Sequence, residues 1–336
     1  MSEKIISNIK PFNDVYYIDC FFNSVFPILE HFGRSIYPVL ANDVFVFCHR
    51  IEEGFLHPSV KNIQITGFSE LSDDLDIQND NRFTGFDLIA LTRHAVDNQR
   101  PVVVWVDCHE IEMRKDAYQK THWAHTLLAY GYDDATSQVH VIEHRHRDNL
   151  FYKPMTMSYQ DFVNGNNGYI SHFHHGQFPT YHEFYVSQEQ GDNALGDDGV
   201  RKRHCGVLAV NLRNHMGDMT KGMENLARFT KDYQYLVLNG KDYAGNIPFL
   251  VAQLNKVINF RTMEAYRMER LFGTDSMGVK PLRELISQWS TARLILAKLA
   301  AYGKYEQEPM QNTVDRIKQV EDLENAYIGY LQKEFG

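Results

Sequence analysis

The chain has 336 residues, of which 43% are apolar and 23% charged, and its net charge is −9. This length allows one large or two medium domains with a sizeable core, and the composition is that of an ordinary globular protein. The acidic balance argues against a nucleic-acid partner, because proteins that bind nucleic acids usually present a basic face.

No targeting or membrane segment is expected. The N-terminal stretch MSEKIISNIKPF lacks a basic region followed by an apolar one, and no run approaches eighteen apolar residues. The four cysteines are far apart and form no CxxC motif: Cys20, Cys48, Cys108 and Cys205. We expect free thiols in a cytoplasmic protein rather than a disulfide framework.

The first 190 residues mix helical and strand patterns. The stretch CFFNSVFPILEHFG predicts a helix that begins at Cys20, is kinked at Pro27 and ends at Gly33. Residues 84–99 predict a second helix, and the run 100–108, rich in valine after its proline, is typical of a buried strand. Further strands are expected at 125–134, 137–144 and 182–187, the first two paired as a hairpin.

The composition changes after residue 187. Residues 188–199 are polar and rich in Gly and Asp, which predicts a linker. Apolar residues at helical spacing then predict four helices, at 207–239, 246–273, 279–303 and 312–335. The sequence therefore predicts an α+β domain over 1–190 and a helical accessory or lid domain over 200–336.

Cys20 stands at the start of its predicted helix, directly after Asp19. A free cysteine is often only a small buried hydrophobe. At a helix N-terminus, however, the helix dipole stabilises the thiolate and makes the thiol a nucleophile. Nucleophilic catalysis also needs an imidazole within hydrogen-bond reach and a third group that orients it.

The stretch KTHWAHTLLAYGYDDATSQVHVIEH offers both of these groups. His125 opens one predicted strand and Glu143 ends the next, with the turn near DDATS. The hairpin is expected to bring the two side chains together. His125 taken alone is equally well interpreted as a structural histidine, but a thiol, a histidine and an acid in this order favour a catalytic site.

These residues carry a resemblance to a known family. Residues 10–190 resemble the papain-like acyltransferases typified by the amide-forming enzyme of butirosin biosynthesis, and more distantly the cysteine peptidases that process bacteriocin leaders. The matching segments are DCFFNSVFPILEHFG, QRPVVVWVDCHEIEM and THWAHTLLAYGYDDATSQVHVIEH. The resemblance implies a papain-like cysteine protease fold with an antiparallel sheet, followed by the helical domain.

The resemblance assigns three roles. Cys20 becomes the nucleophile, His125 the general base and acid, and Glu143 the orienting carboxylate. The third residue is usually Asp in the family, so Asp133 and Asp148 stay open as alternatives. The family's peptidases place a Gln before the Cys for the oxyanion hole. This chain has none there, which leaves Asn13 and backbone N–H groups as candidate donors.

The implied function is amide-forming acyl transfer in secondary metabolism, such as antibiotic biosynthesis of the nonribosomal type or the amide synthesis of closthioamide. The implied partners are an acyl or peptidyl carrier protein bearing a phosphopantetheine thioester and a small amine acceptor, with no cofactor, no nucleic acid and no membrane. The missing Gln weakens the assignment as a peptidase more than the assignment as an acyltransferase. A thioester has a good leaving group, so acyl transfer from it needs less oxyanion stabilisation. A cysteine peptidase or amide hydrolase and a catalytically disabled binding protein remain the alternatives.

Other candidate groups carry less weight. The sequences HWAH and HFHH contain several histidines, but no HExxH motif accompanies them, so no metal site is expected. Cys48 is expected in the core. Cys108 is a weaker rival nucleophile because no helix start lies behind it. Cys205 follows a basic cluster in the second domain.

Overall fold

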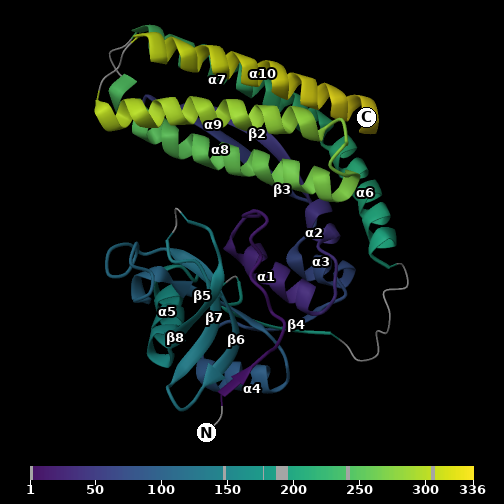
Figure 1. The fold of residues 1–336 in the computed structure, drawn as a ribbon, viewed down its shortest axis with the longest axis vertical. Coiled ribbons are helices and arrows are strands. Elements are labelled where there is room, and N and C mark those ends of the chain that lie inside the picture. The colour runs from purple at the N-terminus through teal and green to yellow at the C-terminus, as the bar shows by residue number, and fades with distance from the viewer. Residues whose placement is uncertain (1–2, 147–148, 177, 187–195, 240–242, 304–306) are drawn as a thin grey trace. The chain divides into compact units, whose positions relative to one another are not determined.

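The computed structural model describes residues 3–146, 149–176, 178–186, 196–239, 243–303 and 307–336. The chain divides into two compact units. The sheet unit comprises Met1–Ile36 and Phe68–Ala194, and the helical unit comprises Tyr37–Gly67 and Leu195–Gly336. Mixed α+β structure with an antiparallel sheet and a helical C-terminal region is therefore present, as the sequence predicts (Figure 1).

The sheet unit is built on seven strands within the described residues. They lie in the order β4-β9-β5-β6-β7-β8, with β1 paired to β6, and every pairing is antiparallel. The strands are β1 (Glu3–Ile5), β4 (Gln78–Arg82), β5 (Val102–Asp107), β6 (Ala124–Asp133), β7 (Gln138–Glu143), β8 (Lys153–Ser158) and β9 (Tyr181–Tyr185). The three strands expected between residues 100 and 144 are confirmed as β5, β6 and β7, and that expected at 182–187 corresponds to β9.

Helices cover both faces of this sheet. One face buries alternate residues of β5, β6 and β7 against Leu88 and Ala95 of α4 and Phe162 of α5. The other face receives α1, whose Phe21 stacks on Trp105 of β5. The helical segments are α1 (Cys20–His31), α3 (Phe68–Asp74), α4 (Leu88–Asp97), the short 3-10 helix η1 (Cys108–Glu110) and α5 (Tyr159–His172).

The β6–β7 hairpin has the predicted connection but not a regular register. Asp133 pairs with Gln138 beside the turn, so the hairpin expected around DDATS is confirmed. Between Ala129 and Gly131 the register shifts by one residue, which leaves Tyr130 as an extra residue in β6. Such a β-bulge changes which residues of the two strands share a face.

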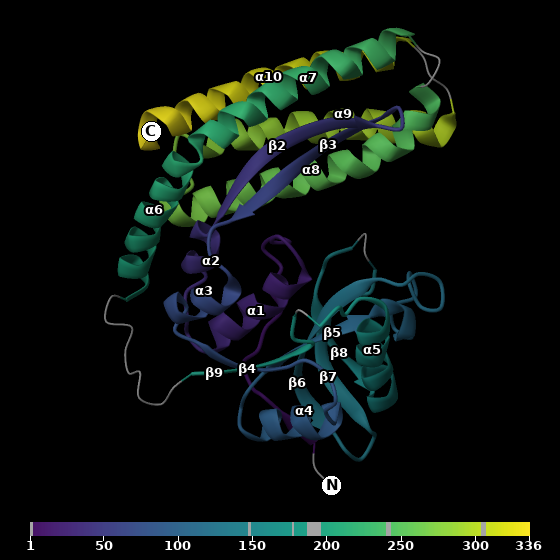
Figure 2. The same ribbon diagram turned by 180° about the vertical axis from the view of Figure 1, so that it is seen from behind.

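The helical unit holds the predicted C-terminal helices and a hairpin that the sequence did not reveal. Its β2 and β3 pair antiparallel, and Figure 2 shows this hairpin lying along the helices. Phe47 of β2 stacks on Trp289 with ring centroids 6.3 Å apart. The elements are α2 (Tyr37–Ala41), β2 (Asp43–Glu52), β3 (Phe55–Gln64), α6 (Gly196–Asn214), α7 (Met216–Asn239), α8 (Tyr243–Phe272), α9 (Val279–Tyr302) and α10 (Gln307–Phe335).

The observed units differ from the predicted division into 1–190 and 200–336. Residues 37–67 belong with the helical unit because the apolar run of β2 is buried against α7, α8 and α9. The helix expected at 207–239 is interrupted at His215, between α6 and α7. Of the predicted linker, residues 188–195 lie outside the described part of the chain, and from Gly196 onward the residues are helical.

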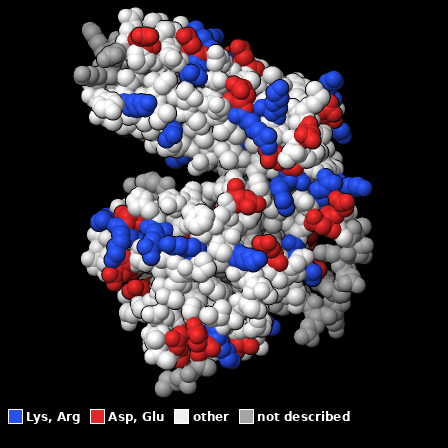
Figure 3. Space-filling model, viewed as in Figure 1, with Lys and Arg blue, Asp and Glu red and all other residues white. Residues whose placement is uncertain are grey.

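Acidic and basic side chains are interspersed on the surface of both units on the face drawn in Figure 3. The negative net charge is therefore not gathered into one patch on that face. Among the helices of the described residues, none has the length and apolar character that a membrane span requires.

Candidate active site

Cys20 is the first residue of α1, as predicted. Asp19 caps the helix: its backbone is extended, and its carboxylate accepts a hydrogen bond from the backbone N–H of Phe22 at 3.2 Å. The Cys20 side chain is buried but not sealed, with 7% of the residue exposed. The positive end of the helix dipole therefore lies beside the thiol.

The segment before Cys20 is held under backbone strain. Ile18 has φ +58°, a left-handed conformation that costs a β-branched residue about 1–3 kcal/mol. The buried Asn23 fixes this segment by accepting a hydrogen bond from the Tyr17 N–H (2.8 Å) and donating one to the Val15 carbonyl (3.0 Å). The position of the Cys20 thiol is therefore set by the tertiary structure as well as by helix propensity.

His125 and Glu143 form a fully buried pair. The imidazole Nε2 of His125 lies 3.1 Å from Oε1 of Glu143 and 2.9 Å from Oε2. Both residues are at most 1% exposed. The contact occupies Nε2 of the ring, so Nδ1 is the nitrogen left to interact with another group.

A side-chain hydrogen bond joins Cys20 and His125. One turn into α1, the hydroxyl of Ser24 lies 3.1 Å from the hydroxyl of Thr126, which locks the helix against the residue that follows His125 in β6. Burial alone would lower the pKa of His125, but the charges of Glu143 and Cys20 and the hydrogen bonds to both raise it to about 10.

Arg114 completes the buried charge cluster, and the sequence analysis missed it. Its guanidinium is fully buried, pairs with both oxygens of Asp116 (3.2 and 3.1 Å), and has its central carbon 4.7 Å from the centroid of the Trp123 ring. Its remaining nitrogen lies 3.4 Å from Oε1 of Glu143 and 3.3 Å from Sγ of Cys108. The stretch EIEMRKDAYQK has no periodicity that would distinguish this arginine from an exposed one.

His144 lies on the other side of Glu143 and stays neutral. Burial lowers the pKa of His144 to about 4. The charge of Glu143 opposes this shift, and the charges of His125 and Arg114 add to it. Burial would raise the pKa of Glu143, but the charges of His125 and Arg114 and the hydrogen bond to His125 hold it below the ordinary value. Glu143 is therefore an anion shared between one charged histidine and one arginine.

Asn13 is tied to the backbone of Tyr152. Its amide nitrogen donates to the Tyr152 carbonyl (2.9 Å), and its amide oxygen accepts from the Tyr152 N–H (2.8 Å). The amide nitrogen of Asn13 has a second N–H that could donate to an oxyanion. The role of Asn13 as an oxyanion donor stays a prediction. The buried Tyr152 hydroxyl has no hydrogen-bond partner among the described residues. Burial, together with Glu143 and Cys20, raises its pKa well above the ordinary value.

Of the two alternative acids, Asp133 is described by the structure, and its carboxylate is bound at the β6–β7 turn and not to His125. Asp133 lies beside the β6–β7 turn, where its carboxylate accepts hydrogen bonds from the Ala135 N–H (2.8 Å) and the Thr136 hydroxyl (2.6 Å). Asp148 lies outside the described residues. Glu143 is thus the acid that meets His125.

The other cysteines lie in environments that differ from that of Cys20. Cys108 is fully buried, and burial raises the pKa of its thiol. Arg114 opposes this rise, and the charges of Glu143 and Cys20 add to it. Cys48 is half-buried rather than in the core, and its thiol donates to the Val46 carbonyl. Cys205 donates to the Leu271 carbonyl at 3.0 Å. All four cysteines are free thiols.

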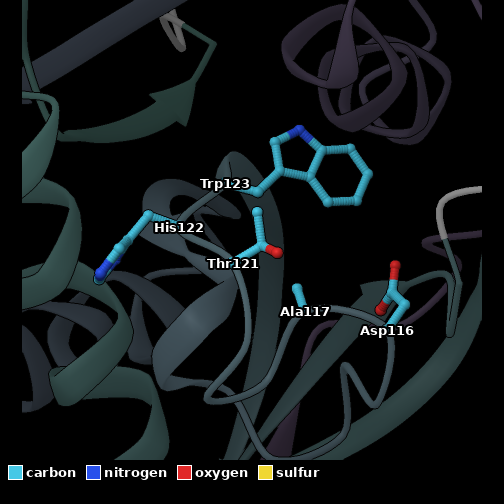
Figure 4. A pocket seen from close by; sticks show the side chains of 5 residues that line it. All are labelled: Asp116, Ala117, Thr121, His122 and Trp123. Carbon is cyan, nitrogen blue, oxygen red and sulfur yellow. The ribbon is translucent and has the colours of Figure 1, made fainter.

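A cavity of about 160 Å³ lies beside the buried cluster. Trp123 lines it, and the Trp123 indole also contacts His125, with ring centroids 5.8 Å apart. Figure 4 shows the Trp123 indole and the Asp116 carboxylate on one side and the His122 imidazole turned away from them. The lining residues are Asp116, Ala117, Thr121, His122 and Trp123.

The two histidines of HWAH diverge in the fold. His125 is buried on Glu143, whereas His122 is exposed and contacts Asp107. Donor atoms of His125, Glu143 and His144 lie within 4.8 Å of one another, as do those of Asp107, His122 and His172. The first set is already joined by its own hydrogen bonds and by Arg114.

No protein-family model matches the chain, and no curated protein matches it either. The functional assignment therefore depends on the geometry of the site. A thiol at a helix N-terminus, an imidazole in contact with it and a buried carboxylate behind the imidazole are the groups that nucleophilic cysteine chemistry requires.

Proposed function

We propose that the chain is a cysteine acyltransferase with a papain-like catalytic unit, which forms an amide from a thioester and an amine. The observation that carries this proposal is the chain of contacts from Cys20 to His125 to Glu143. Its support is geometric, since the thiol, the imidazole and the acid come from α1, β6 and β7 and meet only in the folded chain.

In the first half-reaction the Cys20 thiolate attacks the thioester carbonyl of the acyl donor. The tetrahedral intermediate collapses, the carbon–sulfur bond to the donor breaks, and the departing thiolate takes the proton held by His125. The acyl group is then a thioester of Cys20. Backbone N–H groups at the start of α1 and the Tyr152 hydroxyl are the donors proposed to stabilise the oxyanion, together with Asn13.

In the second half-reaction a primary amine attacks the Cys20 thioester. His125, now neutral, takes the proton from the attacking nitrogen, and collapse releases the amide and returns the thiolate. Glu143 keeps the imidazole oriented and stabilises its charged form in both steps. Arg114 is proposed as a positioning residue, because it binds Glu143 and not the reacting atoms.

We propose a carrier protein bearing phosphopantetheine as the donor and a small amine as the acceptor, with no cofactor. The proposed setting is biosynthesis of a secondary metabolite such as an antibiotic, in the cytoplasm, where free thiols persist. A cysteine peptidase or amide hydrolase is the second candidate, since the same groups would serve it. The role of the helical unit as a lid stays a prediction.

The test uses the full chain and carrier proteins loaded with a panel of acyl groups. The expected result is a mass increase equal to the acyl group on the peptide that contains Cys20, absent in Cys20→Ala and retained in the matched control Cys48→Ala. Added amines should then yield the amide faster than water yields the acid. An adduct with hydrolysis alone would favour the hydrolase, and no adduct with any donor would contradict the acyl-enzyme.

A further inference from the structure

A second group of metal-binding side chains lies in the sheet unit, outside the Cys20 site. Asp107, His122 and His172 each offer one donor atom, and these atoms lie within 4.8 Å of one another. Asp107 ends β5, His122 precedes β6, and His172 is the last residue of α5. Three segments that are distant in sequence thus converge at one point.

Gly168 explains how α5 brings His172 to this point. A Cβ atom on Gly168 would lie 3.0 Å from Cβ of Asp107 and 2.8 Å from Cγ of Glu110, so a side chain there would force the helix away. His172 follows four residues later and lies on the same face of α5. The close approach at Gly168 therefore places the His172 imidazole beside Asp107.

Asp107 orients His122. One carboxylate oxygen of the fully buried Asp107 accepts the backbone N–H groups of His109 (2.9 Å) and Trp123 (3.0 Å). The other oxygen lies 2.6 Å from Nδ1 of His122. When Nδ1 donates to this oxygen, Nε2 presents its lone pair, which is how carboxylates commonly orient metal-binding histidines.

His172 is the second imidazole. Its ring centroid lies 3.8 Å from that of His122, and its nitrogens have no hydrogen-bond partner among the described residues. His109 stacks on the opposite side of His122 at 4.2 Å, with its own Nδ1 on Glu110 at 2.8 Å. The exposed His172 can turn toward His122, which Asp107 and His109 hold in place.

We propose that Asp107, His122 and His172 hold a divalent transition-metal ion of the kind that imidazole and carboxylate ligands favour, such as zinc. The two imidazoles supply nitrogen ligands, Asp107 anchors His122 or adds an oxygen, and water completes the shell. With zinc–nitrogen distances near 2.1 Å, donors lie at most about 4.2 Å apart, so small side-chain rotations close the site.

A bound ion would join the end of β5, the segment before β6 and the end of α5. Its place is structural: the site contains neither Cys20 nor His125, and the proposal stands whether or not the chain transfers acyl groups. This proposed metal site differs from the sequence-based expectation that no metal site is present. That expectation rested on the missing HExxH motif and not on the fold.

The test is zinc binding to the full chain after removal of metals by a chelator, measured by competition with a coloured zinc indicator. We expect one equivalent for the wild type. His122→Ala and His172→Ala should each weaken binding at least about 10-fold, and Asp107→Asn about 10- to 100-fold. His94→Ala removes an exposed histidine of α4 and should leave binding unchanged.

A second readout separates binding from misfolding. Zinc should raise the thermal midpoint of the wild type, because the ion binds only the folded site, and should not raise that of His172→Ala. Without zinc, the two midpoints should agree, since His172 is exposed. Less than half an equivalent bound by the wild type, or equal binding by His172→Ala, would overturn the proposal.

Discussion

Glu143 reaches the face of the sheet that carries His125 because β6 contains one extra residue, Tyr130. Leu128 pairs with Ile142, so the next step of the register brings Glu143 beside Leu127, which shares a face with His125. Without the bulge, the register set at the turn would bring Glu143 beside Leu128, on the opposite face. The observed register makes His125 and Glu143 diagonal neighbours.

Gly131 next to this bulge is expected to tolerate no side chain. A Cβ there would lie 2.8 Å from the backbone oxygen of Lys4 and 3.2 Å from Cβ of His140. Gly131→Ala should therefore destabilise the protein by about 1–3 kcal/mol, measured by urea unfolding. Gly67→Ala is the control, because nothing lies within 4 Å of its Cβ position. Equal stability of the two variants would contradict the close packing of β1 on β6.

Cys20 is expected to react with iodoacetamide faster than the other three cysteines. Its thiol interacts with His125, whereas Cys48 and Cys205 donate to backbone carbonyls and Cys108 is fully buried with a raised pKa. Peptide mapping after brief labelling gives the order. His125→Ala should slow Cys20 and leave Cys48 unchanged, and a first label on Cys108 would move the nucleophile there.

Glu143 is expected to matter less than its two partners for acyl transfer. Cys20→Ala and His125→Ala should each abolish turnover of an acyl-loaded carrier protein, because the two groups act as a unit. Glu143→Gln should lower turnover by about 10-fold or more, since it retains one hydrogen bond to His125 but loses the charge. Unchanged turnover in Glu143→Gln would remove the orienting role from this residue.

Arg114 is expected to be required for stability. Arg114→Met leaves Asp116 buried without its cation and Glu143 with His125 as its cation, and breaking such a buried pair costs about 3–5 kcal/mol. Lys115→Met removes an exposed ion pair with Glu112 and should cost less than about 1 kcal/mol. Urea unfolding of the two variants checks the difference, and similar midpoints would mean that Arg114 is dispensable.

Stability is expected to fall as the pH drops from 6.5 toward 4. Burial lowers the pKa of both His144 and His182 to about 4, so between these pH values the unfolded chain binds protons that the folded chain does not. His182→Gln should therefore make the acid decline in the thermal midpoint shallower, and the exposed His94→Gln should not. Parallel curves for His182→Gln and the wild type would contradict the assignment.

At alkaline pH the dependence of stability on pH has the opposite sign, so stability is expected to fall as the pH rises. The pKa of His125 is raised to about 10 in the fold, so its contribution to stability is complete below 6.5 and is lost as the pH rises toward 10. His125→Ala, though less stable, should lack this decline.

The sequence by itself determined the local elements of the site. Asp19 before an apolar run fixed the start of α1 at Cys20, while an apolar run that ends in a Gly/Asp turn predicted β6 and an alternating pattern predicted β7, because capping, turns and burial act over a few neighbours. The four C-terminal helical patterns were visible for the same reason.

Only the tertiary structure decided which residues meet. The Tyr130 bulge, the burial of Arg114 on Glu143 and the hairpin β2–β3 in the helical unit depend on partners far away in the chain. The approach of His172 to Asp107 depends on the packing of Gly168, which no local pattern encodes. Register and side-chain pairing are set by the free energy of the whole packed unit, so local propensity cannot specify them.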